Sequence, residues 1–135
     1  MKKYIVVIGM VFLFSCKEQY NCEEKVCTKV YVSIGVTYKN SVNEFVEVEG
    51  FKVYNTRTKT YITEDVYKDP VWSKGRYVII SDASLGKLSE KGDKLIVSAK
   101  NPVTNTINET EFVISGGKCN CHVEKIAGPD EIILQ

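Results

Sequence analysis

The sequence predicts an all-β protein, an antiparallel β-sandwich of about seven or eight strands. Three observations support this prediction. Apolar and polar residues alternate along several stretches, which is typical of half-buried strands. Turn-forming residues recur about every ten residues between these stretches. No long stretch has the 3.6-residue period of an amphipathic helix, so a sandwich fits the pattern best.

The first half of the chain contains four expected strands. The strand at residues 30–37 places Val30, Val32, Ile34 and Val36 on one face. The others are residues 42–49, where Val46 and Val48 share a face, then 51–54 beyond a break or bulge at Gly50, and 59–63 after a turn at 55–58.

The second half begins with residues 64–74, which show no clear alternation. The strand at 76–81 is apolar on both faces, which predicts a place inside a sheet. One or two helical turns are expected from Asp82 to about Glu90. The remaining strands are expected at 94–100 with Leu95, Val97 and Ala99 inward, at 109–115 with Phe112 and Ile114 inward, and at 119–126 and 131–134.

Residues 36–59 resemble the start of transthyretin-like, carboxypeptidase-regulatory-like β-sandwiches, with a strand, a polar turn and a second strand ending Val53-Tyr54-Asn55-Thr56. Gly75-Arg76-Tyr77 is similar to the Gly-x-Tyr that opens their central strand. The Asp-x-x-Gly-x-Pro turn of that family is absent, and Lys39-Asn40-Ser41-Val42 stands in its place. The resemblance implies a binding or spacer module without an active site. An immunoglobulin-like sandwich is the other arrangement that suits the pattern.

The first sixteen residues have the layout of a bacterial secretion signal. Lys2 and Lys3 precede an apolar run over residues 4–14, and Ser15-Cys16 follows it. The run is too short for a membrane-spanning helix, which needs about 20 apolar residues. Leu13-Phe14-Ser15-Cys16 resembles the lipobox of bacterial lipoproteins, which implies cleavage before Cys16 and a lipid on that cysteine. We therefore expect a signal peptide over 1–15, a lipidated tether over 16–24 and one sandwich domain over 25–135.

The composition of the expected mature chain narrows the choice of partners. Removing 15 of 135 residues leaves 120, with 16 Lys plus Arg against 17 Asp plus Glu, a formal charge of −1. Nucleic acid is not an expected partner, because nucleic-acid binding needs clustered cations. Acyl chains on Cys16 would anchor the protein to a membrane, since two chains suffice for stable attachment. The expected location is the envelope of a Gram-negative cell, at the outer membrane, on its periplasmic or surface face.

Four cysteines lie beyond the lipobox, as the pairs Cys22 with Cys27 and Cys119 with Cys121. An even number in an exported protein predicts two disulfides. On a regular strand the Cα atoms of Cys119 and Cys121 would be about 6.6 Å apart with parallel side chains, near the limit for a bridge. Each is therefore expected to pair with Cys22 or Cys27, in an order that stays open. The alternative is a zinc or copper site at these four cysteines, with His122 beside them.

His122 is the only histidine, so any Ser-His-Asp or Cys-His mechanism must use it. On a regular strand its side chain would point away from both neighbouring cysteines. The chain contains none of the Gly-x-Ser-x-Gly, His-Glu-x-x-His or glycine-rich phosphate-binding motifs. The sequence therefore predicts a protein that is not an enzyme and uses no cofactor.

Trp72 is the aromatic residue best suited to contact a partner. Most tyrosines are expected to fill half-buried strand positions. Trp72 instead lies in the irregular segment 64–74 beside Pro70, where an exposed aromatic ring could contact a glycan or a protein. The resulting hypothesis is a non-catalytic, lipid-anchored envelope protein that acts as a binding or structural module. A metal-handling lipoprotein that uses Cys22, Cys27, Cys119 and Cys121 is the alternative.

Overall fold

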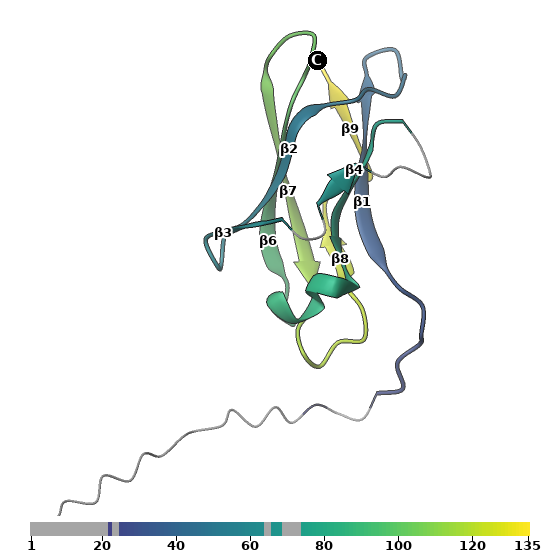
Figure 1. The fold of residues 1–135 in the computed structure, drawn as a ribbon, viewed down its shortest axis with the longest axis vertical. Coiled ribbons are helices and arrows are strands. Elements are labelled where there is room, and N and C mark those ends of the chain that lie inside the picture. The colour runs from purple at the N-terminus through teal and green to yellow at the C-terminus, as the bar shows by residue number, and fades with distance from the viewer. Residues whose placement is uncertain (1–21, 23–24, 64–65, 69–73) are drawn as a thin grey trace, which may run out of the picture.

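The computed structural model describes residues 22, 25–63, 66–68 and 74–135. In this part of the chain two β-sheets pack face to face, which confirms the predicted all-β sandwich (Figure 1). Sheet A contains, in spatial order, β4 (Tyr67–Lys68), β5 (Arg76–Ser81), β1 (Ser33–Asn40) and β9 (Glu131–Leu134). Sheet B contains β3 (Thr60–Ile62), β2 (Glu49–Asn55), β6 (Asp93–Lys100), β7 (Ile107–Ser115) and β8 (Glu124–Ala127). A six-residue 3₁₀ helix, η1 (Asp82–Lys87), follows β5.

The pairing within the sheets departs from the prediction in one respect. All paired strands are antiparallel except β1 and β9, which run parallel with Thr37 opposite Glu131 and Asn40 opposite Leu134. The described residues form nine strands. One of them, β4, is a two-residue strand on β5 in a segment where alternation predicts none. The first and last strands of the sandwich are therefore neighbours.

The core lies between the two sheets and has the composition that the alternating patterns predict. β5 lies between β4 and β1, as expected for a strand that is apolar on both faces, and five of its six residues are buried. The buried core residues come from both sheets and from loops at both ends. The buried core residues among those that the structure describes are Val36, Tyr38, Val48, Val53, Tyr77, Ile79, Ile80, Leu88, Leu95, Val97, Ala99, Phe112, Ile114, Val123, Ile132 and Leu134.

Residues 42–48 do not form the predicted strand. Phe45 makes one isolated bridge to Lys39. The side-chain oxygen of Asn40 accepts the backbone N–H of Glu44 at 2.8 Å, and its side-chain amide donates to the Glu44 carboxylate at 3.1 Å. Local bonds of this kind compete with strand pairing, so the segment folds as a turn.

Two strand boundaries also differ from the prediction. β1 begins at Ser33, so Val30 precedes the strand and 66% of its surface is exposed. β2 begins at Glu49, and its pairing with β6 is irregular between Glu49 and Lys52. Gly50, between these two residues, has a φ of 60°, which confirms the break expected at this glycine.

Of two tyrosine hydroxyls in the core, one has hydrogen-bond partners among the described residues and the other has none. The hydroxyl of Tyr77 donates to the Val48 carbonyl at 3.1 Å and accepts the Val48 N–H at 2.9 Å. The hydroxyl of Tyr38 is buried and has no hydrogen-bond partner among the described residues. Burial, together with the nearby Tyr77, raises the pKa of Tyr38 well above its ordinary value. The two rings pack nearly perpendicular, with centroids 5.8 Å apart.

We expect these tyrosines to respond oppositely to loss of the hydroxyl. Tyr38→Phe should leave the free energy of unfolding unchanged or raise it by about 1 kcal/mol, because an unpaired buried polar group is removed. Tyr77→Phe should lower it by about 1–3 kcal/mol, because both backbone groups of Val48 lose their partner. Urea unfolding of the two variants measures the difference. Equal losses would contradict the assignment of Tyr38 as the unpaired hydroxyl.

Candidate functional site

The cysteines, the histidine and the acidic residues that could take part in binding or catalysis lie at one end of the sandwich, which we call the base. The base comprises η1, the loop at residues 116–123 between β7 and β8, and the N-terminal segment at residues 25–32. In Figure 1 it is the lower end, and the C-terminus lies at the opposite end. Segments that are distant in sequence therefore meet at the base.

Two disulfides join the N-terminal segment, and Cys22 just before it, to the loop at residues 116–123. Cys22 pairs with Cys119 and Cys27 pairs with Cys121, each with Cα atoms 5.2 Å apart. This confirms that each late cysteine reaches back to an early one, and it gives the order that the sequence left open. A zinc or copper site would need thiolates, and the described residues contain no group of three or more His, Cys, Asp or Glu able to hold a metal ion.

The extended strand predicted over residues 119–126 is only partly present. Residues 118–122 form turns and bends, and β8 starts at Glu124. The Asn120 side chain donates to the Gly116 carbonyl at 2.6 Å, which closes a turn, and the two disulfides draw this loop toward the N-terminal segment. The regular strand on which the expectation for His122 depended is therefore absent at this residue.

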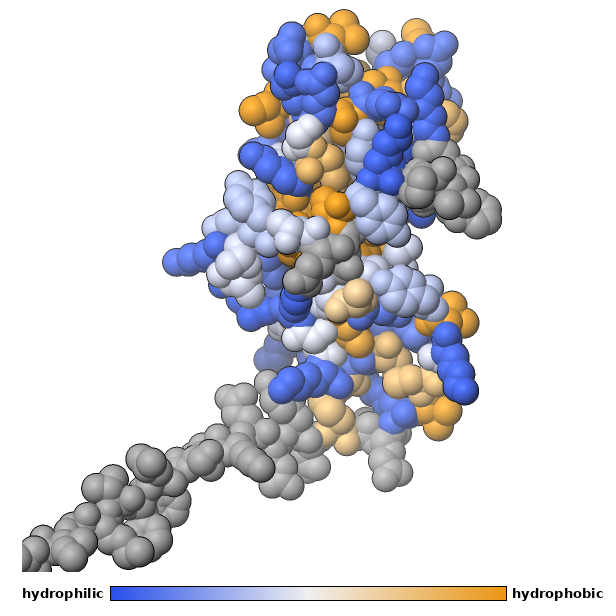
Figure 2. Space-filling model, in the orientation of Figure 1, coloured by the Kyte–Doolittle hydropathy of each residue, from blue (hydrophilic) through white to orange (hydrophobic). Residues whose placement is uncertain are grey.

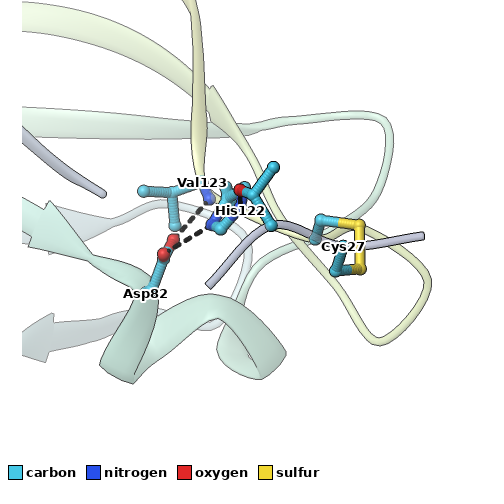
Figure 3. Close-up of a disulfide and its surroundings, with 6 residues drawn as sticks. Cys27, Asp82, His122 and Val123 are labelled. Carbon is cyan, nitrogen blue, oxygen red and sulfur yellow. Dashed lines mark hydrogen bonds and ion pairs between the residues drawn. A yellow bond between two sulfur atoms is a disulfide. The ribbon is translucent and has the colours of Figure 1, made fainter. Parts of the chain in front are cut away.

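His122 links the N-terminal segment to η1 (Figure 3). Its Nδ1 lies 2.7 Å from Oδ2 of Asp82, and its Nε2 lies 2.8 Å from Oγ1 of Thr28. The Asp82 carboxylate also accepts the backbone N–H of Val32 and of Val123, each at 2.9 Å. One carboxylate therefore holds together the start of β1, the start of η1 and the approach to β8.

The electrostatics of Asp82 follow from these contacts. Burial alone would raise the pKa of this carboxyl, but hydrogen bonds from His122 and from the two backbone amides outweigh burial. The pKa of Asp82 therefore lies below its usual value. Its side chain is 13% exposed and that of His122 is 24% exposed, so the pair is partly screened by solvent.

The Thr28 hydroxyl, the His122 imidazole and the Asp82 carboxylate are hydrogen-bonded in the same order as the groups of a Ser-His-Asp triad. Thr28 would be the nucleophile, His122 the base and Asp82 the residue that orients the imidazole. Sequence reasoning missed this set, because Thr28 and Asp82 are 94 and 40 residues from His122 and no motif joins them. His122 was identified in the sequence as the only histidine, and Asp82 only as the expected start of a helix. The structure gives the capping role to Ser81, whose side chain accepts the Ala83 N–H.

A second polar cluster lies at the sheet B side of the base. The Asp93 carboxylate is fully buried and accepts from Nε of Arg57 at 2.6 Å and from Nδ2 of Asn55 at 2.7 Å. Arg57 Nη2 donates both to Asp93, at 2.9 Å, and to the Lys87 carbonyl at 2.8 Å. This cluster ties the β2–β3 turn to the end of η1.

The structure describes the tyrosines among the other predicted site residues, but neither Cys16 nor Trp72. Cys16 and Trp72 lie outside the described residues, so the lipid site and the proposed aromatic contact stay predictions. Among the tyrosines, Tyr38 and Tyr77 belong to the core, whereas Tyr61 is 54% exposed and packs edge-to-face on Tyr54 with ring centroids 5.2 Å apart.

The loss of the Asp82 contacts should be measurable. We expect Asp82→Ala to lower the free energy of unfolding by about 2–3 kcal/mol, because two backbone N–H groups and His122 lose their acceptor. Thr28→Ala removes only an exposed hydroxyl contact and should cost less than about 1 kcal/mol.

Because the pKa of Asp82 is lowered, its contribution to the free energy of unfolding is present above about pH 4 and declines as the pH falls below that value. Thermal unfolding at pH 7 and pH 3 tests this, and a wild-type advantage over Asp82→Ala that is as large at pH 3 as at pH 7 would contradict it.

Comparison with known proteins gives no match to a family model, to a curated protein or to a solved structure. In the described part of the chain, no helix has the length and apolar character needed to cross a bilayer.

Proposed function

We propose that the protein is a non-catalytic, lipid-anchored module of the cell envelope, held with its base toward the membrane. The observation that carries this proposal is the disulfide between Cys22 and Cys119 at the base. Only five residues separate Cys22 from the expected acylation site at Cys16, and the six residue steps that join these cysteines span at most about 22 Å. An acylated chain would therefore keep the base within that distance of the lipid.

The opposite end would then face away from the membrane. It consists of the β1–β2 connection at residues 41–48 and the β6–β7 connection at residues 101–106. Val42, Val103 and Ile107 are 70%, 84% and 69% exposed there, and Figure 2 shows apolar side chains at this upper end. Exposed apolar side chains of this kind suit contact with a protein partner. This end supports the binding-module interpretation.

Acylation is tested by expressing the full chain in a Gram-negative host and measuring the mass of the mature N-terminal peptide. We expect cleavage before Cys16 and a mass increase from acyl chains, with the protein recovered in the detergent phase. Cys16→Ala should stay uncleaved, and residues 22–135 should keep both disulfides. An unmodified Cys16 in a protein that retains residues 1–15 would overturn the proposal.

A second function, hydrolysis of an ester, is favoured by the Thr28–His122–Asp82 distances alone. Thr28 Oγ1 would attack the ester carbonyl while its proton passes to His122, which then protonates the leaving alcohol. Water would release the acid from Thr28 by the same route. A fluorophosphonate probe tests for an activated hydroxyl. Labelling of Thr28 that is lost in His122→Ala would support hydrolysis, and absence of labelling would remove it.

A further inference from the structure

The first half of β1 has an open edge in sheet A. On one side β5 pairs with residues 33–37 of β1, and on the other side β9 pairs with β1 only from Thr37 onward. The described residues place no strand beside residues 33–36 on that second side. About 13 Å of the β1 edge is therefore without a neighbouring strand.

Hydrogen bonds on the β5 side show how the backbone of β1 is oriented. Val32 donates its N–H to the Asp82 carboxylate at 2.9 Å, and its carbonyl accepts the Asp82 N–H at 3.0 Å. Tyr38 donates its N–H to the Gly75 carbonyl at 2.9 Å. Because Gly75 precedes β5 and Asp82 follows it, the even-numbered residues of this stretch direct their backbone groups toward β5.

The odd-numbered residues face the open side. Thr37 donates its N–H to the Asp130 carbonyl at 3.0 Å, at the point where β9 begins. Successive residues of a strand direct their backbone groups to opposite edges, so Ser33 and Gly35 face the same side as Thr37. No described residue bonds to the N–H or C=O groups of Ser33 and Gly35 on that side. Four backbone groups at this edge can therefore pair with a partner.

A hollow of about 390 Å³ lies against this edge. Its lining includes Ser33, Ile34 and Gly35 of β1, and also Lys125 and Asp130, which form an ion pair with each other. Its volume lies within the range of pockets that hold ligands. The open edge therefore offers both backbone groups and room for a side chain.

We propose that this edge binds an extended peptide segment of another protein, which adds to sheet A as a strand in line with β9. Unpaired N–H and C=O groups at a sheet edge are a template for such addition, because an extended backbone supplies matching groups at the same spacing. Side chains of the added strand alternate between the two faces of the sheet. One set would lie on the same face as Ile34, which packs against the core, so the segment should alternate apolar and polar residues.

The proposal gives the proposed binding module a class of partner, an alternating peptide in extended conformation. It does not rest on acylation of Cys16, because every residue that it uses lies between 32 and 130. Failure of peptide binding would leave the acylation result standing, and failure of acylation would leave the edge of β1 unchanged.

The test follows peptide binding to the full chain, purified in detergent, by NMR. The probe is acetyl-Thr-Val-Thr-Val-Thr-Lys-amide. The control probe has proline in place of the second threonine, which removes a donor and disfavours a strand. The first probe, at up to about 1 mM, should shift the amide resonances of Ser33 and Gly35 and slow their exchange with solvent, and the control probe should not.

Ser33→Pro and Ser33→Ala form a matched pair of variants. Ser33 is exposed and begins β1, so a proline there removes one N–H from the open edge without breaking a bond to β5. Gly35 is unsuitable for substitution, because a Cβ there would lie 2.8 Å from the Tyr77 carbonyl oxygen. Ser33→Pro should weaken probe binding about tenfold, the value of one backbone hydrogen bond, and Ser33→Ala less than about twofold.

Several results would overturn the proposal. They are equal binding of the two probes, equal losses in the two variants, no shift at Ser33 and Gly35, or shifts confined to β3 or β8. Slow exchange of these two amides before any probe is added would also contradict it, because the edge would already be covered. The cover would be a second copy if sedimentation shows a dimer, and the chain itself if it shows a monomer.

Discussion

Replacing all four disulfide cysteines by serine should lower the free energy of unfolding by about 7 kcal/mol, well above twice the cost of losing one disulfide. The two disulfides enclose nearly the same loop, with sequence separations of 97 and 94. The first disulfide to form closes this large loop. The loop-entropy relation gives a stabilisation of about 4.7 kcal/mol for that closure. The second then closes a ring of only about nine residues, worth about 2.6 kcal/mol.

Each single removal should therefore cost about 2.6 kcal/mol, since the remaining disulfide still closes the large loop. Urea unfolding of Cys22→Ser/Cys119→Ser, of Cys27→Ser/Cys121→Ser and of the fourfold variant tests this. The fourfold loss should exceed the sum of the two single losses by about 2 kcal/mol. A domain of ordinary stability would then be close to unfolded. Strictly additive losses would show that the disulfides act through local contacts instead of through the shared loop.

Asp93 should give the second large effect. Asp93→Ala is expected to lower the free energy of unfolding by about 3–5 kcal/mol, because it leaves the buried amide of Asn55 and part of Arg57 without their acceptor. The matched control is Glu111→Ala, which breaks the Lys94–Glu111 ion pair, whose side chains are 52% and 50% exposed. That exposed pair should be worth less than about 1 kcal/mol. Comparable losses in the two variants would contradict the role of burial.

The same carboxylate should make the protein sensitive to acid. Burial alone would raise the pKa of Asp93, but hydrogen bonds from Arg57 and Asn55 and the Arg57 charge outweigh it and leave the pKa below its usual value. Its contribution is therefore complete above about pH 4 and is lost as the pH falls below that value. The stability difference between wild type and Asp93→Asn should narrow between pH 7 and pH 3. An unchanged difference would show that Asp93 is not ionised in the folded protein.

Sheet B shows what the sequence predicts well. Leu95, Val97, Phe112 and Ile114 are all fully buried, because an alternating strand in a sandwich has one face that must be apolar. The interior place of β5 followed from its two apolar faces. The terminal strand at 131–134 was also found with its correct bounds.

The wrong strand predictions arise where side-chain hydrogen bonds or disulfides override the alternation of apolar and polar residues. Residues 42–48 carry alternating valines, yet the side chain of Asn40 bonds the following backbone and makes a turn. Residues 119–122 look extended, yet two disulfides and Asn120 bend them. The contacts of His122 with Asp82 and Thr28 form at this bend, so alternation alone could not predict them.

The parallel pairing of β1 with β9 has a consequence for biosynthesis. β1 has β5 on one side, and among the described residues β9 and the Asp130 carbonyl pair with its other side. β1 and β5 are therefore synthesised well before the strand that covers the other edge of β1. An uncovered edge invites pairing with another chain. Any device that holds the emerging polypeptide unfolded until Leu134 has been added would protect it from aggregation.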